Sequence, residues 1–122
     1  MIADEWKNRI RASCEAAGTY RPFFDEVIAT LAGILERRDE ALRQFEDSGG
    51  HVIVEHTNKG GATNLEQNPA LRALNDMNRD ALAYWRDLGL TPAGLKKIDE
   101  KALKEQKKTS LSDLLKGIGS DE

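Results

Sequence analysis

The sequence has little of what disulfide-bonded, membrane-spanning or metal-binding proteins need. Its single cysteine, Cys14, excludes an internal disulfide and fits a reducing compartment. No apolar run approaches the roughly 18 residues of a membrane-spanning helix, and the N-terminal segment has no apolar signal core. The two histidines, His51 and His56, form no zinc-binding spacing with Cys14. We therefore expect a soluble, intracellular protein with no metal, no other cofactor and no membrane partner.

Patterns that carry catalysis are also scarce. The carboxylates lie between basic residues on polar helix faces, which is the usual pattern of a solvated surface. Gly60-Gly61 has the composition of a turn, and no glycine-rich phosphate loop follows a predicted strand. We expect no catalytic residue and a protein that is not an enzyme.

Apolar residues make up only 39% of the 122 residues, and 32% are charged. A chain of this length forms one domain, and this composition gives it a thin core. Such a chain often completes its burial against a partner or a copy of itself. The net charge is −3, yet residues 92–108 carry six lysines against three carboxylates. A locally basic segment of this kind can contact phosphates.

Most of the chain has helical periodicity, so we predict a mainly α fold. Apolar residues recur every four positions in residues 2–17, and Gly18 follows as a stop signal. Further helices are predicted at 22–47, at 69–88 after the capping pair Asn68-Pro69, and from Pro92 onward. Only three residues separate the last two helices, so we expect them to meet at an angle or fold back.

A wide apolar stripe runs along the predicted helix 22–47. It is interrupted by Arg38 and leaves two interpretations open, a helix buried in the core or one whose stripe lies partly between subunits. For the second, the candidate interface residues are Phe24, Ile28, Leu31, Leu35 and Leu42.

Residues 51–67 interrupt the helices with a short β-branched run, the turn-forming segment Asn58–Gly61 and a second arm of weak strand propensity. We predict a small β-hairpin here, or else a loop. An isolated hairpin is marginally stable. If the first arm is a strand, helix 22–47, helix 69–88 or an adjacent subunit should cover it.

The C-terminal part is predicted as a polar linker, residues 107–110, and a short amphipathic helix. We accordingly divide the chain into a core, 1–106, and a linker with a partner-docking helix, 107–122. A helix this short is unstable alone and should dock, either on its own protomer or on a partner. Its apolar side is formed by Leu111, Leu114, Leu115 and Ile118.

Two basic rows are candidates for contacting DNA. The helix from Pro92 begins like the second helix of a helix-turn-helix and has lysines on more than one face, with Lys97, Lys101, Lys104 and Lys108 in a row. Arg72, Arg79 and Arg86 share one side of the preceding helix, near aspartates that could neutralise them. The alternative is a solvated charged face. The candidate DNA-binding residues are Lys96, Lys97, Lys101, Lys104, Lys108, Arg72 and Arg79.

The order of features from residue 20 to 98 resembles the phage terminase small subunit family. Members pass from an extended segment with Glu and Gly, through Asn-Pro-Ala opening a helix, to Gly-Leu-Thr-Pro opening the next. Here these are Glu55, Gly60-Gly61, Asn68-Pro69-Ala70 and Gly89-Leu90-Thr91-Pro92. After Thr-Pro the family typically has Arg, one residue, Arg and an apolar residue, where this chain has Leu95-Lys96-Lys97-Ile98.

The resemblance implies a non-enzymatic viral DNA-packaging factor in the cytoplasm of the infected bacterial host. Such subunits form homo-oligomeric rings, recognise the packaging site on double-stranded DNA, and recruit and regulate the large subunit with its ATPase and nuclease. A ring would also multiply a weak basic patch by the number of subunits. The alternatives are a helical scaffold or adaptor without DNA binding, and a small dimeric helix-turn-helix regulator.

Overall fold

Helix boundaries lie close to the capping signals identified in the sequence, Gly18, Asn68-Pro69 and Pro92. This computed structural model describes residues 1–120, and the side chains of residues 1–117. Helix α1 spans Ala3–Ala17, the 3-10 turn η1 at Pro22–Phe24 leads into α2 at Asp25–Asp47, α3 spans Pro69–Asp87, and α4 spans Pro92–Ser120. Strands β1, Ile53–Thr57, and β2, Thr63–Gln67, lie between α2 and α3 in the chain. The predicted mainly α fold class with one small hairpin is confirmed.

Two glycines end helices as predicted. Gly18 follows α1 with φ +73°, and Gly89 follows α3 with φ +74°, a left-handed conformation that other residues adopt only with strain. At Gly89 a side chain would also lack room, because a Cβ would lie 2.7 Å from Ile98 and 2.8 Å from Thr19. Both conformation and space therefore require glycine at the end of α3.

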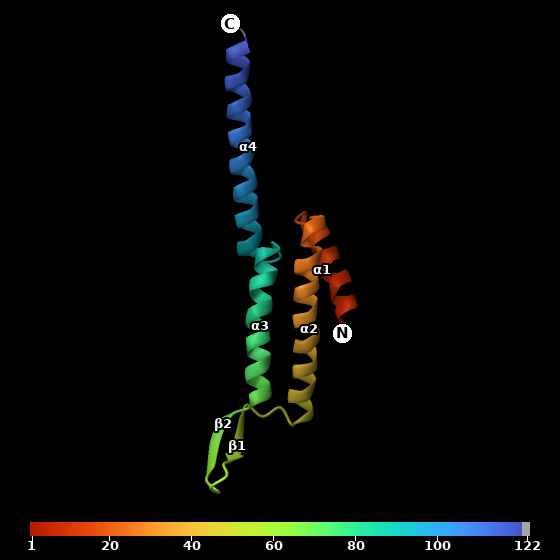
Figure 1. Ribbon diagram of the computed structural model, residues 1–122, viewed down its shortest axis with the longest axis vertical. Coiled ribbons are helices and arrows are strands. Elements are labelled where there is room, and N and C mark those ends of the chain that lie inside the picture. The colour runs from red at the N-terminus through yellow and green to blue at the C-terminus, as the bar shows by residue number, and fades with distance from the viewer. Residues whose placement is uncertain (121–122) are drawn as a thin grey trace.

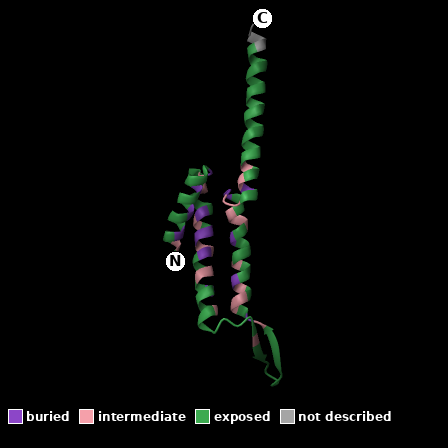
Figure 2. Ribbon diagram, turned by 180° about the vertical axis from the view of Figure 1, so that it is seen from behind, coloured by how far each residue is buried: buried purple, intermediate pink, exposed green. Residues whose placement is uncertain are grey.

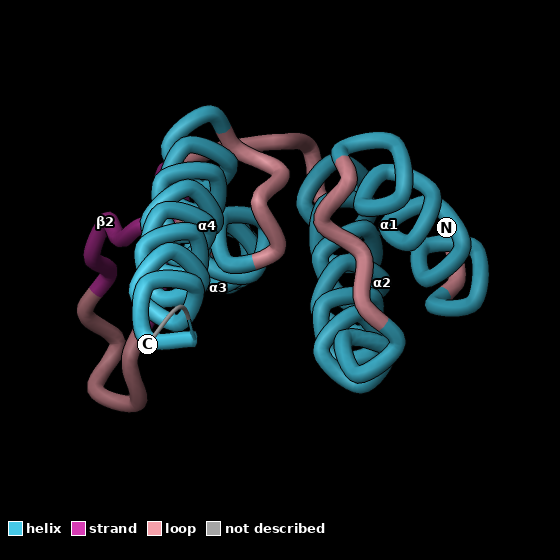
Figure 3. The backbone as a smooth tube through the Cα atoms, turned by 90° about the horizontal axis from the view of Figure 1, so that it is seen from above, coloured by secondary structure: helices cyan, strands magenta, loops and turns pink. Residues whose placement is uncertain are grey.

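The core follows α2, which packs against α1 on one side and α3 on the other (Figure 1). Seen from above, α1, α2 and α3 stand beside one another, and α4 lies over α3 (Figure 3). Figure 2 shows that buried positions lie in this three-helix part, while α4 is exposed beyond its first turns. The central cluster is formed by Trp6, Ile10, Cys14, Ile28, Leu31, Ala32, Leu35, Ala81 and Leu88. Leu82 is exposed, because it is turned about 100° from the buried Ala81.

The apolar stripe of α2 belongs mainly to the protomer itself. Ile28, Leu31 and Leu35 are only 2%, 0% and 0% exposed, so these three pack in the core and are not available to another copy. Of the predicted interface residues, Phe24 is half-buried against the core and Leu42 is exposed.

Arg38 interrupts the stripe because it serves the contact between α1 and α2. Its guanidinium lies 5.4 Å from the centre of the Trp6 ring and 3.0 Å from a carboxylate oxygen of Asp39. Trp6 in turn donates its indole N–H to the other oxygen of Asp39, at 2.8 Å. These contacts fix α1 on α2.

The segment 51–67 is an ordered hairpin, with β1 and β2 antiparallel from Ile53 opposite Gln67 to Thr57 opposite Thr63. It extends beyond the ends of α2 and α3, away from the helices (Figure 1). Ile53 and Leu65 are exposed, so the helices of the same chain do not cover it as expected. The hairpin instead joins the body through the buried Asn68, whose side chain donates to the carbonyl of His51, at 2.9 Å, and accepts from the N–H of Ala70, at 3.0 Å.

Helix α4 continues without a break through the segment expected as a linker, residues 107–110. The residues leading into it, 104–108, are lysine, glutamate and glutamine, which are good helix formers and need no packing. Within the segment, the Thr109 hydroxyl donates to the carbonyl of Glu105 at 3.0 Å. Leu111, Leu114 and Leu115 are 59%, 62% and 60% exposed, so they do not dock on their own protomer. The side chain of Ile118 lies outside the described residues. None of the described helices is long and apolar enough to cross a membrane.

Candidate nucleic-acid interface

The lysines of α4 gather on one side of the helix. At about 100° per residue, Lys96, Lys97, Lys101, Lys104, Lys107 and Lys108 fall within a sector of roughly 140°. The opposite side carries Leu95, Ile98 and Ala102. The lysines were expected on more than one face, but in the continuous helix α4 they share one. The result is one basic stripe, fully exposed.

Carboxylates neutralise little of this stripe. Lys96 lies 4.0 Å from Glu100. The other five lysines of the stripe have no carboxylate within ion-pair distance among the described residues. Glu100 also lies within this sector, so the stripe keeps most, but not all, of its positive charge.

The arginine row of α3 is also exposed. Arg72, Arg79 and Arg86 are seven residues apart, so they share one side of the helix. Arg79 donates to Asp76 at 2.7 Å, which partly neutralises the row as the sequence suggested. Arg72 and Arg86 make no ion pair within the described part of the chain.

The joint between α3 and α4 decides how the two rows meet. Gly94, in the first turn of α4, lies so close to the last turn of α3 that a Cβ there would be 2.1 Å from the carbonyl oxygen of Arg86. Thr91 caps α4 by accepting the N–H of Gly94 on its hydroxyl, at 3.0 Å. From this joint α4 leads away from the body along the long axis of the molecule (Figure 1). It does not fold back along α3, as we had allowed, and so departs from the expected helix-turn-helix.

A hollow of about 410 Å³ lies at this joint. It brings the end of the arginine row next to the start of the lysine stripe. Three cationic side chains and one carboxylate border it. Its lining consists of Arg86 and Asp87 from α3, and Ala93, Gly94, Lys97, Ile98 and Lys101 from α4. We name this set the joint hollow. Sequence reasoning left Arg86 out of the candidate residues, although its seven-residue spacing from Arg79 was a signal for it.

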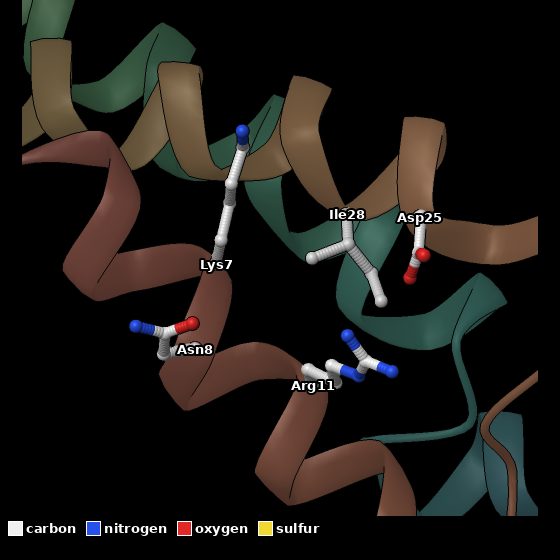
Figure 4. A pocket seen from close by; sticks show the side chains of 5 residues that line it. All are labelled: Lys7, Asn8, Arg11, Asp25 and Ile28. Carbon is white, nitrogen blue, oxygen red and sulfur yellow. The ribbon is translucent and has the colours of Figure 1, made fainter. Parts of the chain in front are cut away.

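A smaller hollow of about 220 Å³ between α1 and α2 offers no comparable cluster (Figure 4). Lys7, Asn8 and Arg11 of α1 border it together with Asp25 and Ile28 of α2. Arg11 is engaged elsewhere, 4.7 Å from the centre of the Tyr20 ring and 3.4 Å from Glu15. Asp25 accepts the hydroxyl of Tyr20 at 2.7 Å, and this hydrogen bond raises the pKa of that hydroxyl. The hollow is thus a polar seam between two helices.

Because α4 is continuous, the exposed leucines near its C-terminal end can be placed relative to the lysines. Leu111, Leu114 and Leu115 fall in the same sector as the lysines, at about 60°, 0° and 100° from Lys96. One side of α4 therefore carries a basic stripe near the body and an apolar patch near the tip. We name Leu111, Leu114 and Leu115 the leucine patch.

Cys14 and the histidines lie in different surroundings. Cys14 is buried in the core, and burial raises the pKa of its thiol. His56 is exposed in the hairpin, 3.9 Å from Glu66. Among the described residues, no group of three or more His, Cys, Asp or Glu side chains is placed to hold a metal ion.

Comparison with protein families gave one result. The model of a family described as phage terminase, small subunit, matches residues 3–105. The match covers the three-helix body, the hairpin, the joint and the first half of α4. No curated protein and no solved structure matched the chain.

Proposed function

Because the chain belongs to the phage terminase small subunit family, we propose that it is the non-catalytic subunit of a viral DNA-packaging complex. Family membership supports a role in phage DNA packaging within the infected host cell. In this role the protein binds the packaging site on double-stranded DNA, forms a homo-oligomeric ring, and recruits and regulates the large subunit.

The observation that carries the DNA-binding part is the exposed basic stripe of α4. Five of its six lysines lack a carboxylate partner within the described chain, although the protein as a whole is acidic. Lys97, Lys101 and Lys104 are its central residues. Contacts from such side chains go mainly to phosphates, so they position the duplex and weaken steeply with salt.

Self-association is supported by what the protomer leaves exposed. Its helices α1, α2 and α3 bury a core only along α2, and Phe23, in the turn η1 that precedes α2, is 75% exposed. Leu42, Leu82 and the apolar residues of the hairpin, Ile53 and Leu65, are exposed as well. In a ring, these surfaces would be buried against neighbouring copies. The predicted interface therefore moves from the buried stripe of α2 to these outer positions.

The leucine patch supports a role in recruiting the large subunit. Three exposed leucines at the end of a helix that leaves the body are accessible to a partner without any rearrangement of the core. Exposed apolar clusters of this kind mark protein interaction sites. The patch lies on the lysine side of α4, so DNA and the large subunit would approach the same side of the helix.

The mass of the protein in solution tests this proposal against its alternatives. A ring predicts a particle of many subunits by light scattering. A dimer would favour the small regulator instead, although α4 does not have the helix-turn-helix arrangement. A monomer that does not bind duplex DNA would favour a scaffold or adaptor and contradict the proposal.

A further inference from the structure

The joint hollow brings cationic residues from two helices to one concave surface. Arg86, Lys97 and Lys101 border it, and none of the three has a carboxylate within ion-pair distance among the described residues. By contrast, Arg11, Arg38 and Arg79 each lie within 3.4 Å of a carboxylate oxygen. Asp87 is the one acidic side chain that lines the hollow. Three cationic residues and a single carboxylate therefore border one concave surface, which leaves an excess of positive charge.

We propose that the joint hollow is a seat for a backbone phosphate of duplex DNA, held by Arg86, Lys97 and Lys101. This inference rests on the proposed DNA-packaging function and assigns a specific contact within it. A guanidinium group can donate two hydrogen bonds to a phosphate, and ammonium groups supply further charge.

The composition of the hollow selects the backbone phosphate over a whole nucleotide. No aromatic side chain lines it, so a base would have no ring to stack on. Its apolar part consists of Ala93, Gly94 and the half-buried Ile98. These residues give no hydrogen-bonding side chain that could read a base edge. The absence of a stacking ring and the excess of cationic residues therefore favour a backbone phosphate as the ligand.

The close approach at Gly94 builds the seat. The missing side chain lets the first turn of α4 contact the carbonyl end of α3. This brings Lys97 and Lys101, which follow on the next two turns of α4, to the side of Arg86. Cationic residues from two helices thus border the same hollow.

The seat also joins the two basic rows into one track. Arg72 to Arg86 covers about 21 Å of α3, and Lys97 to Lys108 covers about 16 Å of α4, at about 1.5 Å per residue. Since α4 leads on along the long axis, the track is roughly 40 Å long, which corresponds to about 12 base pairs at 3.4 Å each. The duplex then lies along α3 and α4, with the joint hollow near its middle. In this arrangement the end of α4 does not enter the major groove of the duplex.

The test uses the assembled full-length protein and a fluorescently labelled duplex of arbitrary sequence. Binding is followed by fluorescence anisotropy at several salt concentrations. Arg86→Gln, Lys97→Gln and Lys101→Gln are each compared with Lys59→Gln, a matched control in the exposed turn of the hairpin. Circular dichroism and light scattering confirm that each variant keeps its fold and assembly. We expect each seat variant to weaken binding about 3- to 10-fold and to flatten the salt dependence, with no change for Lys59→Gln.

Two results would overturn the seat and leave DNA binding in place. The first is that Arg86→Gln, Lys97→Gln and Lys101→Gln all bind the duplex as tightly as the wild type does. The second is that inorganic phosphate, added at constant ionic strength, saturates the hollow while the variants lose no affinity for the duplex. Saturation would be seen as changes in the NMR amide shifts of residues 93–101. That outcome would make the hollow a site for free phosphate. A wild-type assembly that binds no duplex even at low salt would instead refute the DNA role of the proposed function itself.

Discussion

Gly94 of α4 packs directly against the backbone of Arg86 in α3: a Cβ on Gly94 would lie only 2.1 Å from the carbonyl oxygen of Arg86. That atom belongs to the backbone and cannot turn aside as a side chain could. The contact sets how α4 leaves α3, and with it the joint hollow. It is therefore a structural requirement for the basic track.

Replacing Gly94 by alanine should open this joint. Alanine normally stabilises a helix by up to about 1 kcal/mol over glycine, but here we expect a net loss of roughly 1–3 kcal/mol from overpacking. Thermal unfolding measures the loss, and small-angle scattering measures the change in the direction of α4. Gly117→Ala is the matched control, since a Cβ there meets nothing within 4 Å, and it should not lower the melting temperature. Equal stability of both variants would refute the requirement for glycine at the joint.

Asn68 should hold the hairpin on the body. Its side chain both caps α3 and binds the carbonyl of His51, and its N–H donates to the carbonyl of Val52 at 2.8 Å. Asn68→Ala should cost about 1–2 kcal/mol of stability, because the cap is lost and the carbonyl of His51 loses its part-buried hydrogen bond. Hydrogen exchange should show faster exchange throughout β1 and β2. Asn78→Ala, on the exposed side of α3, should leave the hairpin protected. Unchanged exchange in Asn68→Ala would show that the hairpin is held by other contacts.

The carboxylate of Asp39 should make stability depend on acid pH. Burial by itself would raise its pKa, but hydrogen bonds from Trp6 and Arg38, and the charge of Arg38, lower the pKa below its ordinary value. The ionised form is therefore favoured in the folded protein. Its contribution is present above the unfolded pKa of about 3.9 and is lost as the pH falls through the lower folded value.

Asp39→Asn tests this linkage. The variant should be less stable than the wild type at pH 7, and the difference should shrink as the pH falls below about 4. Melting temperatures between pH 7 and pH 3 measure it. Trp6→Phe, which removes the indole N–H but keeps a ring, should reduce stability in the same direction. Parallel melting curves for wild type and Asp39→Asn across this range would contradict the role of the carboxylate.

The lysine stripe and the leucine patch should act together because they lie on the same side of α4. Two alanines inserted between Lys108 and Thr109 turn the patch by about 200°, whereas seven inserted helix-forming residues turn it by only about 20°. Both variants should bind duplex DNA as the wild type does. Only the two-residue insertion should abolish DNA-dependent stimulation of the large-subunit ATPase. Equal stimulation by both would show that the two surfaces act independently.

The local signals in the sequence predicted most element boundaries. Gly18, Asn68-Pro69, Gly89 and Thr91-Pro92 stand at helix ends, because capping depends on short-range chemistry that the sequence displays directly. The continuity of α4 was not predicted, because residues 104–110 have no apolar side to form a pattern. There the good helix formers of residues 104–108 maintain the helix without packing.

The joint hollow lay beyond what periodicity can show. Arg86 and Lys97 belong to different helices, and their proximity depends on the direction in which α4 leaves α3. That direction follows from a backbone contact at Gly94, which no spacing of charges reveals. The apolar stripe of α2 was ambiguous for a similar reason, since the same pattern serves a core helix and an interface. The packing of Ile28, Leu31 and Leu35 decided for the core.

Sedimentation velocity of the protein with a labelled duplex of about 40 base pairs tests the central claim most directly. One experiment gives the mass of the free assembly and shows whether the duplex moves with it. The account predicts a homo-oligomer of many subunits that carries the duplex at low salt and releases it as the salt concentration rises. A monomer that sediments separately from the duplex at every salt concentration would contradict it.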